Sequence, residues 1–410
     1  MLTPILVAIL LVASSVEGAS IQEHISGLVG VPVLNFQLRH FHTLAPDGKT
    51  VLFQDVAHAS LQAMPRYPIR VKPTKRHRPS SQAAFHEFRR LSKRSMSSRV
   101  NWEEDTIPGP DISSNETLGV LARMSFNAYN EPGDSGWYDL EGQWNISYPV
   151  GWESDSDGLR GHVFSTPDNL TVVLSIKGTS ASILGGGGPT QRKDKLNDNL
   201  LYSCCCARVD WSWSTVCGCY AGAGKCDTGC LEESLAEETL FYPIGVNLYN
   251  NLTYMYPDAN IWVTGHSLGG GLASLLGVTF GTPVVAFESP GERLAARRLH
   301  LPSPPSTHHI THVYHNADPI PLGACTGKLS TCYAAGYALE SRCHLGKTVL
   351  YDTVGQLEWS VDIRTHGILV IIEKVLTLPW KVPVPAPEDD CIDCFAWEFG
   401  DFLNKTNPKP

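Results

Sequence analysis

The stretch IWVTGHSLGGGLASLLG, at residues 261–277, decides the fold of this 410-residue chain. It begins with apolar, β-rich residues that predict a strand over residues 261–264, and it continues with small and apolar residues that predict a helix over residues 268–280. The turn between these two elements contains the pattern G-x-S-x-G. A strand that passes into a helix through this pattern is typical of an α/β hydrolytic enzyme.

The turn supplies a candidate nucleophile, Ser267. In so sharp a turn, side chains two residues before and two residues after the serine would collide, so Gly265 and Gly269 are needed there. The turn also places the Ser267 hydroxyl at a helix N-terminus, where developing negative charge is stabilised. The alternative is a glycine-rich helix start with an incidental serine, but the strand-like and helix-like flanks favour the catalytic interpretation.

Strands and helices alternate from residue 115 to residue 378. Apolar runs predict further strands at residues 170–176, 283–287 and 310–314, and an amphipathic pattern predicts one helix over residues 231–255. Strands that alternate with helices form a mostly parallel sheet that is covered on both faces. The predicted class is an α/β-hydrolase fold with a disulfide-rich insertion.

A hydrolase of this class needs an acid and then a histidine later in the chain than the serine. Asp318 follows the last predicted strand and precedes a proline, which makes it a better candidate for the acid than Asp352 or Asp362. His366 opens an apolar helix after a loop, and it is preferred to His344, which stands beside a cysteine. The expected catalytic group therefore combines Ser267 with Asp318 and His366.

The developing oxyanion needs two backbone N–H donors. Leu268 follows the nucleophile and supplies one of them. The second donor is expected from the loop after the strand at residues 170–176, where Thr179 is the candidate. His266 is expected to be a neighbour of the nucleophile rather than its base. No metal and no cofactor is expected to take part.

Two features point to the secretory pathway. The apolar run at residues 5–16 is too short to span a bilayer comfortably, and it predicts either a cleaved signal peptide or a retained signal anchor. N-x-[ST] glycosylation patterns, which require a lumenal and exposed loop, begin at Asn115, Asn145, Asn169, Asn251 and Asn404.

The cysteine content agrees with an oxidising compartment. The chain has 12 cysteines, an even number, and seven of them lie between Cys204 and Cys230. Their C-C-C and C-x-C spacing differs from the paired C-x2-C of structural zinc sites, so disulfides are favoured over a zinc cluster. Cys391 and Cys394 form a C-x-x-C in a proline-rich segment, for which a structural role or a short-range disulfide is expected.

Charge separates one segment from the rest. The formal net charge is −9, which argues against nucleic acid as the main partner. Residues 66–99, however, contain eleven Lys or Arg and a single acid, Glu87. A solvated, partly disordered arm is the preferred interpretation, and attraction to an anionic lipid surface is the alternative.

The motifs together resemble the class 3 lipases. The resemblance rests on Thr264-Gly-His-Ser267-Leu-Gly, on Ile176-Lys-Gly-Thr179, on Asp318-Pro-Ile-Pro and on His366, and it covers about residues 115–378. Within that family, the cysteine-rich insertion and Phe287-Glu-Ser-Pro-Gly-Glu resemble the autophagy-related vacuolar lipases of fungi. The resemblance assigns Ser267 as nucleophile, Asp318 as orienting acid, His366 as base and the Thr179 N–H as an oxyanion donor.

The resemblance also implies a biological role. It implies hydrolysis of phospholipids and neutral lipids, and the disintegration of autophagic bodies and multivesicular-body vesicles in the vacuole. It further implies a type II signal-anchored protein that passes through the Golgi and endosomes with its catalytic domain in the lumen. Another secretory-pathway serine carboxylesterase or acyltransferase, and a non-catalytic lipid-binding protein, remain as alternatives.

These observations predict a linear organisation. The apolar N-terminus occupies residues 1–19, and a lumenal region with the basic segment occupies residues 20–114. The lipase-like domain is expected at residues 115–378, with its cysteine-rich insertion at residues 204–230. A proline-rich tail at residues 379–410 is expected to lie irregularly on the surface.

Overall fold

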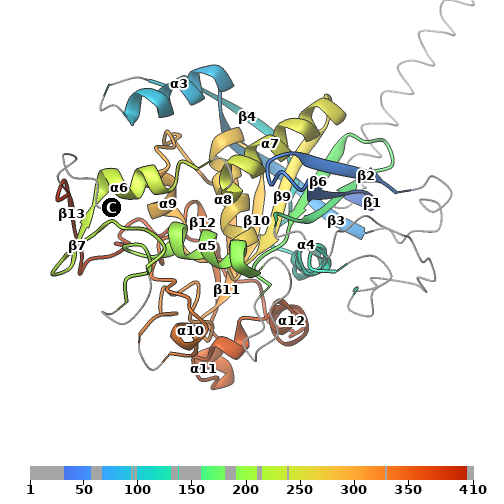
Figure 1. The fold of residues 1–410 in the computed structure, drawn as a ribbon. Helices are drawn as coiled ribbons and strands as arrows, with labels where there is room; N and C mark the ends of the chain where they lie inside the picture. Colours follow the sequence, from blue (N-terminus) through green and yellow to red (C-terminus); the bar gives the residue numbers. More distant parts are fainter. Residues whose placement is uncertain are drawn as a thin grey trace, which may run out of the picture.

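A ten-stranded sheet forms the centre of the computed structural model (Figure 1). The structure describes residues 32–56, 67–93, 96, 99–130, 137, 158–180, 191–209, 215–237, 240–327 and 330–403. The strands run in the order β12-β11-β10-β9-β6-β5-β1-β3-β4, and β2 pairs with β1. Their bounds are β1 Val33–Leu44, β2 Val51–Asp55, β3 Tyr67–Pro79, β4 Trp102–Pro110, β5 Gly161–Ser165, β6 Thr171–Ile176, β9 Asn260–His266, β10 Val284–Phe287, β11 Ile310–His315 and β12 Lys347–Tyr351.

The half of the sheet that carries the site is parallel. Strands β6, β9, β10, β11 and β12 pair in parallel with their neighbours along this half. Parallel strands end at the same edge of a sheet, so the loops after β6, β9 and β11 meet there. The predicted α/β-hydrolase fold is confirmed, and the four strands predicted by apolar runs are present as β6, β9, β10 and β11.

The other half of the sheet is antiparallel and was not foreseen. Strands β5, β1, β3 and β4 continue the same sheet, so a boundary at residue 115 does not separate the N-terminal region from it. The interpretation of the basic segment as a solvated, partly disordered arm is wrong for residues 67–93. These residues form β3, whose cations pair with acids on β4, and the helix α3 (Gln82–Ser92), which is capped by Ser81 and buries Phe85. Arg76 lies 2.6 Å from Asp105 in one such pair.

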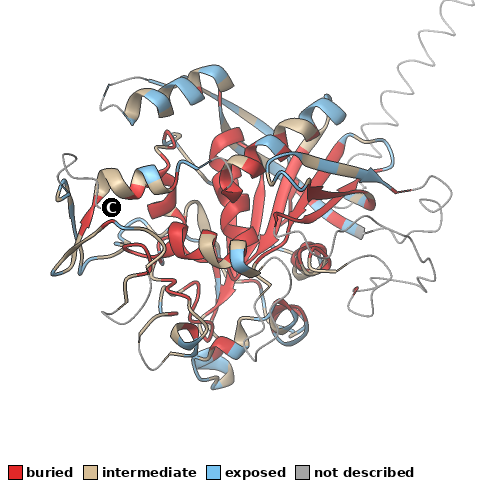
Figure 2. Ribbon diagram, viewed as in Figure 1, coloured by how far each residue is buried: buried red, intermediate tan, exposed pale blue. Residues whose placement is uncertain are grey.

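Both faces of the sheet are covered by helices. Side chains alternate between the faces along a strand, so Val172 and Leu174 enter one core and Val173 enters the other. Helices α5, α7 and α8 contribute to the first core, and α4, α12 and η2 contribute to the second. Figure 2 shows that the central strands and α8 are buried. The bounds are α4 Asn115–Asn127, α5 Gln191–Tyr202, α7 Phe241–Met255, α8 Leu268–Phe280, α9 Arg293–Arg298, α10 Thr331–Ala334, α11 Thr353–Leu357, η1 Ile363–Thr365, α12 Ile368–Val370 and η2 Ile371–Val375.

The predicted helix over residues 231–255 is divided in the structure. Helix α6 (Thr228–Ser234) ends before α7 begins at Phe241. Pro243 explains the break, because proline is tolerated in the first turn of a helix but cannot continue one through its own position. The amphipathic pattern was correct on both sides of the break, and the proline was the signal that marked it.

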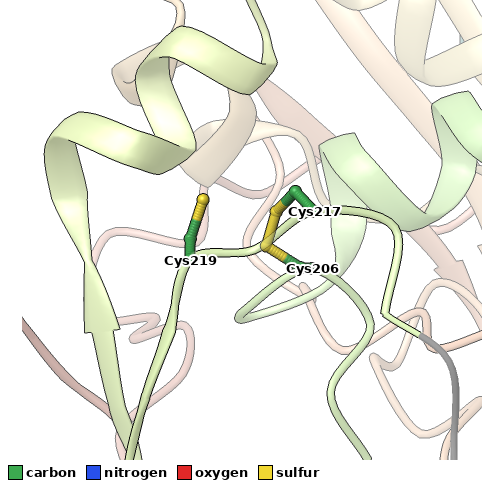
Figure 3. Close-up of side chains that lie close together, drawn as sticks. All are labelled: Cys206, Cys217 and Cys219. Atoms are coloured by element: carbon green, nitrogen blue, oxygen red, sulfur yellow. A yellow bond between two sulfur atoms is a disulfide. The ribbon is translucent and has the colours of Figure 1, made fainter. Parts of the chain in front are cut away.

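All 12 cysteines are paired in disulfides, which confirms the preference for disulfides over zinc. Within the insertion, Cys206 is bonded to Cys217, and Cys219 lies beside this pair (Figure 3). Cys219 is itself bonded to Cys230. These disulfides hold a small sheet of β7 (Tyr220–Gly222), β8 (Lys225–Asp227) and β13 (Glu398–Gly400).

The C-terminal segment is joined to the body of the molecule. Strand β13 pairs with β8, and Ala386 forms a bridge with Thr348 of β12. Cys391 bonds to Cys343, and Cys394 bonds to Cys204. The structural role expected for the C-x-x-C is correct, but a short-range disulfide is wrong, because each cysteine reaches a distant partner.

Among the described residues, no helix has the length and apolar character required to cross a bilayer. The apolar N-terminal run lies outside the described residues, as do Asn145 and Asn404.

Candidate functional site

The turn between β9 and α8 holds Ser267 in an unusual backbone conformation. Its φ is 56° and its ψ is −128°, a combination that L-residues seldom adopt and that is found at functional turns. The Ser267 N–H donates to the carbonyl oxygen of Phe287 at 2.9 Å, which ties the turn to β10. A Cβ on Gly265 would lie 2.5 Å from the carbonyl carbon of Gly269, and one on Gly269 would collide with the Ile176 carbonyl.

The structure brings the three predicted catalytic side chains together. The Nε2 of His366 lies 2.9 Å from the Ser267 Oγ, and the Nδ1 of His366 lies 2.6 Å from the Asp318 Oδ2. The second Asp318 oxygen, Oδ1, accepts the backbone N–H of Ile320 at 2.9 Å. The three residues follow β9, β11 and η1, so elements distant in the sequence deliver them to one edge of the sheet. This geometry suits a serine nucleophile with an oriented base.

Asp318 is completely buried, and its surroundings favour the ionised form. Burial by itself opposes ionisation, but the charge and hydrogen bond of His366 outweigh it and lower the pKa of Asp318. Hydrogen bonds from Glu288 and from the Ile320 N–H act in the same direction. The arrangement keeps a carboxylate directed at the imidazole.

His266 supports the imidazole from the side. Its Nε2 donates to the carbonyl oxygen of His366 at 2.9 Å, and its Nδ1 accepts the hydroxyl of Tyr129 at 2.8 Å. Burial, and then the nearby His366, lower the pKa of His266 to about 3, so its ring is neutral. His266 is therefore a neighbour and not a base. The sequence contained no signal for Tyr129.

The candidate oxyanion loop after β6 is held by two acids of α5. The Thr179 Oγ1 donates to the Asp198 Oδ2 at 2.5 Å. The Asp194 Oδ2 accepts both the Lys177 Nζ at 3.0 Å and the Ser180 N–H at 2.9 Å. Burial raises the pKa of Asp198 to about 8, so this side chain is neutral in acidic and neutral solution. The sequence carries no signal for a role of α5 at the site, because its acids contact loop residues that are fourteen or more positions away.

A cavity of about 550 Å³ opens beside the Ser267 hydroxyl. This volume is within the range of small-molecule sites. Most of the lining is apolar, and it is supplied by Phe126, Ile320, Leu339, Ile363, Ile368, Leu369 and the disulfide of Cys325 with Cys332. The cavity is therefore suited to an apolar chain attached to a reactive group at Ser267.

The residues considered as alternatives for the base and the acid do not contact Ser267. His344 is buried against Glu388 in an ion pair of 3.1 Å, away from Ser267. Asp352 caps α11, and Asp362 pairs with Arg364 at 2.6 Å. None of these side chains forms a hydrogen bond with Ser267 or His366.

The glycosylation candidates that the structure describes are half-buried rather than exposed. They are Asn115, Asn169 and Asn251. Asn115 is also occupied, because its side chain donates to the carbonyl oxygen of Trp380 at 3.0 Å and accepts the hydroxyl of Tyr351 at 3.0 Å. A glycan on the Nδ2 of Asn115 would have to be accommodated beside both contacts.

Comparisons with known proteins give a consistent result. The family model described as Lipase (class 3) matches residues 224–325. The putative lipase ATG15 of Cryptococcus neoformans is 49% identical over 366 residues, which cover 73% of this chain and 70% of the relative. The putative lipase ATG15 of Saccharomyces cerevisiae is 48% identical over 305 residues, and the match covers 73% of this chain and 59% of the relative.

Solved structures are more distant. The Lip2 lipase of Yarrowia lipolytica is 20% identical, with a TM-score of 0.29, and the match covers 57% of this chain and 76% of that one. A triacylglycerol lipase of Penicillium expansum is 13% identical, with a TM-score of 0.31, over 59% of this chain and 80% of that one.

Proposed function

We propose, from the premise that this chain belongs to the ATG15 family of class 3 lipases, that it hydrolyses fatty-acid esters of membrane glycerolipids. In this proposal Ser267 is the nucleophile, His366 is the base and Asp318 is the acid that orients it. The observation that carries the proposal is the chain of contacts from Ser267 through His366 to Asp318, with distances of 2.9 Å and 2.6 Å.

The reaction is a two-step acyl transfer. His366 accepts the proton of Ser267 as the hydroxyl oxygen attacks the ester carbonyl, and then gives it to the departing alcohol. The N–H groups of Leu268 and Thr179 stabilise the negative charge on the carbonyl oxygen. Water, deprotonated by His366, then attacks the acyl-enzyme and releases the fatty acid. The apolar cavity beside Ser267 accommodates the acyl chain.

The proposal extends to the biological role of the protein. Its substrates include phospholipids, and it breaks down autophagic bodies and multivesicular-body vesicles in the vacuole. The similarity to ATG15 lipases and the pairing of all 12 cysteines support delivery through the secretory pathway. A lumenal catalytic domain behind an N-terminal signal anchor belongs to the same proposal. Every Lys and Arg of β3 is paired with an acid, so this strand adds no support for an anionic lipid surface.

The test compares fatty-acid release from phospholipid vesicles by the disulfide-bonded protein and its Ser267→Ala variant. We expect the substitution to lower kcat by at least about 10³-fold, because the nucleophile is lost. Ser274→Ala is the matched control, since Ser274 lies on α8 and contacts Glu292 rather than His366. The Ser274→Ala variant should keep the kcat of the wild type, measured per mole of folded protein.

Two outcomes would change the proposal. Equal release by the wild type and by Ser267→Ala would remove Ser267 from the mechanism and leave a lipid-binding protein. Activity on short soluble esters without any on vesicles would instead indicate a carboxylesterase with the same three residues.

A further inference from the structure

One buried carboxyl group beside the site has no part in the mechanism given above. Glu288 follows β10 directly, one residue after Phe287, whose carbonyl oxygen receives the Ser267 N–H. Its side chain is 0% exposed, and its φ of 45° lies in the left-handed region that is costly for a residue other than glycine. Burial of a carboxyl group and a left-handed φ both cost free energy, so Glu288 needs contacts that stabilise it in this position.

The contacts of Glu288 contain no balancing cation. Its Oε1 accepts the N–H of His315 at 3.2 Å, and its own N–H donates to the Val313 carbonyl at 3.0 Å. Among the described residues, no Lys or Arg forms an ion pair with Glu288. The ring of His315 is 3.7 Å from Oε1, but its Nε2 is directed to the Thr365 carbonyl at 3.2 Å. Burial also lowers the pKa of His315, which disfavours a positive charge on this ring.

The remaining contact is with Asp318. The Glu288 Oε2 is buried and has no N–H or O–H partner among the described residues, and it belongs to a carboxyl group in side-chain contact with that of Asp318. A hydrogen bond between two carboxyl groups requires a proton on one of them. Asp318 is the partner of the imidazole of His366, which favours its ionised form. The shared proton therefore belongs to Glu288.

We infer that Glu288 is a positioning residue for the ester hydrolysis proposed above, and that its neutral carboxyl group donates a hydrogen bond to Asp318 and fixes the carboxylate that orients His366. This role adds a donor to Asp318 without placing a second negative charge beside it. The inference rests on the proposed function, because it acts only through the relay of Asp318 and His366.

The electrostatic surroundings agree with a neutral Glu288. Burial raises the pKa of Glu288 well above its ordinary value, and the charge of Asp318 raises it further. The titratable groups near Glu288 come from β9, from β11, and from the loops after β11 and η1. They are His266, Tyr314, His315, Asp318 and His366.

The experiment uses two substitutions of similar volume in the full disulfide-bonded chain. Glu288→Gln keeps an uncharged donor for Asp318, and Glu288→Met removes the donor but fills the space. For each protein, kcat and KM are measured against pH with phospholipid vesicles and with a short soluble ester. The melting temperature reports on folding.

We expect Glu288→Gln to keep kcat within about threefold of the wild type and to leave the acid limb of the kcat/KM profile in place, since the charge beside Asp318 is unchanged. Glu288→Met should lower kcat by about 10-fold or more with little change in KM. Its acid limb should move to higher pH, because a carboxylate with one donor fewer stabilises the protonated imidazole more strongly.

Glu292→Gln is the matched control, because Glu292 is equally buried but pairs with His312 instead of Asp318. It should lower the melting temperature while leaving the acid limb in place.

The inference is overturned if Glu288→Gln moves the acid limb to lower pH, since Glu288 would then be ionised in the active enzyme. Wild-type kcat in Glu288→Met would overturn it as well. If Glu288→Met does not fold, the pH profile of Glu288→Gln decides alone. Activity that persists in Ser267→Ala would refute the proposed function instead, which separates the two failures.

Discussion

Asp198 of α5 accepts the hydroxyl of Thr179 in the candidate oxyanion loop, and its own carboxyl group is protonated at neutral pH. Its pKa is raised to about 8 by burial, from an ordinary value of 3.8. Between these two pH values the folded protein holds a proton that the unfolded chain has released, so stability falls as the pH rises through this window. Each pH unit is worth about 1.4 kcal/mol for a fully protonated site.

We expect Asp198→Asn to remove this dependence while the side chain still accepts the Thr179 hydroxyl through its amide oxygen. The free energy of unfolding of the variant should rise relative to that of the wild type, by about 1 kcal/mol per unit, as the pH is increased from 5 to 8. Urea titrations at several pH values measure the difference. A constant difference between the two proteins would show that Asp198 is already ionised at pH 5.

Helices, strands and turns that are determined by residues close together in the sequence could be predicted. The turn at Ser267 and the helix α8 follow from the glycines and the small apolar residues around them, and the predicted helix over 268–280 has the observed bounds. Strands β1 and β3 were not predicted, because each depends on a partner distant in the sequence. The same reason explains why Asp318 and His366 could be proposed by chain order, whereas Glu288 and Tyr129 gave no chain-order signal.

At the level of elements, an ion pair between the half-buried Glu388 and the buried His344 helps to hold the C-terminal segment. The Glu388 carboxylate contacts the His344 Nδ1 at 3.1 Å and accepts the Tyr314 hydroxyl at 2.9 Å. Burial opposes the charge on each partner. The mutual contact nevertheless raises the pKa of His344 above its ordinary 6.5 and lowers that of Glu388 to about 2. The Glu388 contribution is present above pH 4.5 and is lost as the pH falls to about 2, whereas the His344 contribution is present below pH 6.5 and is lost as the pH rises through its raised pKa.

We expect Glu388→Gln to lower the free energy of unfolding by about 3 kcal/mol at pH 5 to 6, because it leaves a buried histidine charge without its partner. The loss should shrink in alkaline solution, where His344 becomes neutral. Asp389→Asn is the control, since Asp389 is exposed and adjacent in the chain. Equal effects of the two substitutions on thermal unfolding would contradict the role of the ion pair.

At the scale of the whole molecule, the disulfides differ in the length of chain that they close. Cys204 and Cys394 are separated by 190 residues, and Cys325 and Cys332 by 7. If a disulfide acts by lowering the entropy of the unfolded chain, the Cys204–Cys394 bond stabilises the folded state by about 5 kcal/mol and the Cys325–Cys332 bond by about 2 kcal/mol.

We therefore expect the pair Cys204→Ser and Cys394→Ser to cost about twice as much free energy of unfolding as the pair Cys325→Ser and Cys332→Ser. Denaturant titration of both double variants measures the costs. A larger cost for the short closure would show that contacts at the cavity wall, rather than chain entropy, dominate.

The bond between Cys204 and Cys394 has another consequence. Ser267, Asp318 and His366 all lie in the chain between these two cysteines. A protease that makes a single cut anywhere inside that span produces two fragments that remain covalently joined. The nicked protein would migrate as one species in a non-reducing gel and as two after reduction. It would also keep its three proposed catalytic side chains in one covalently connected molecule after such a cut.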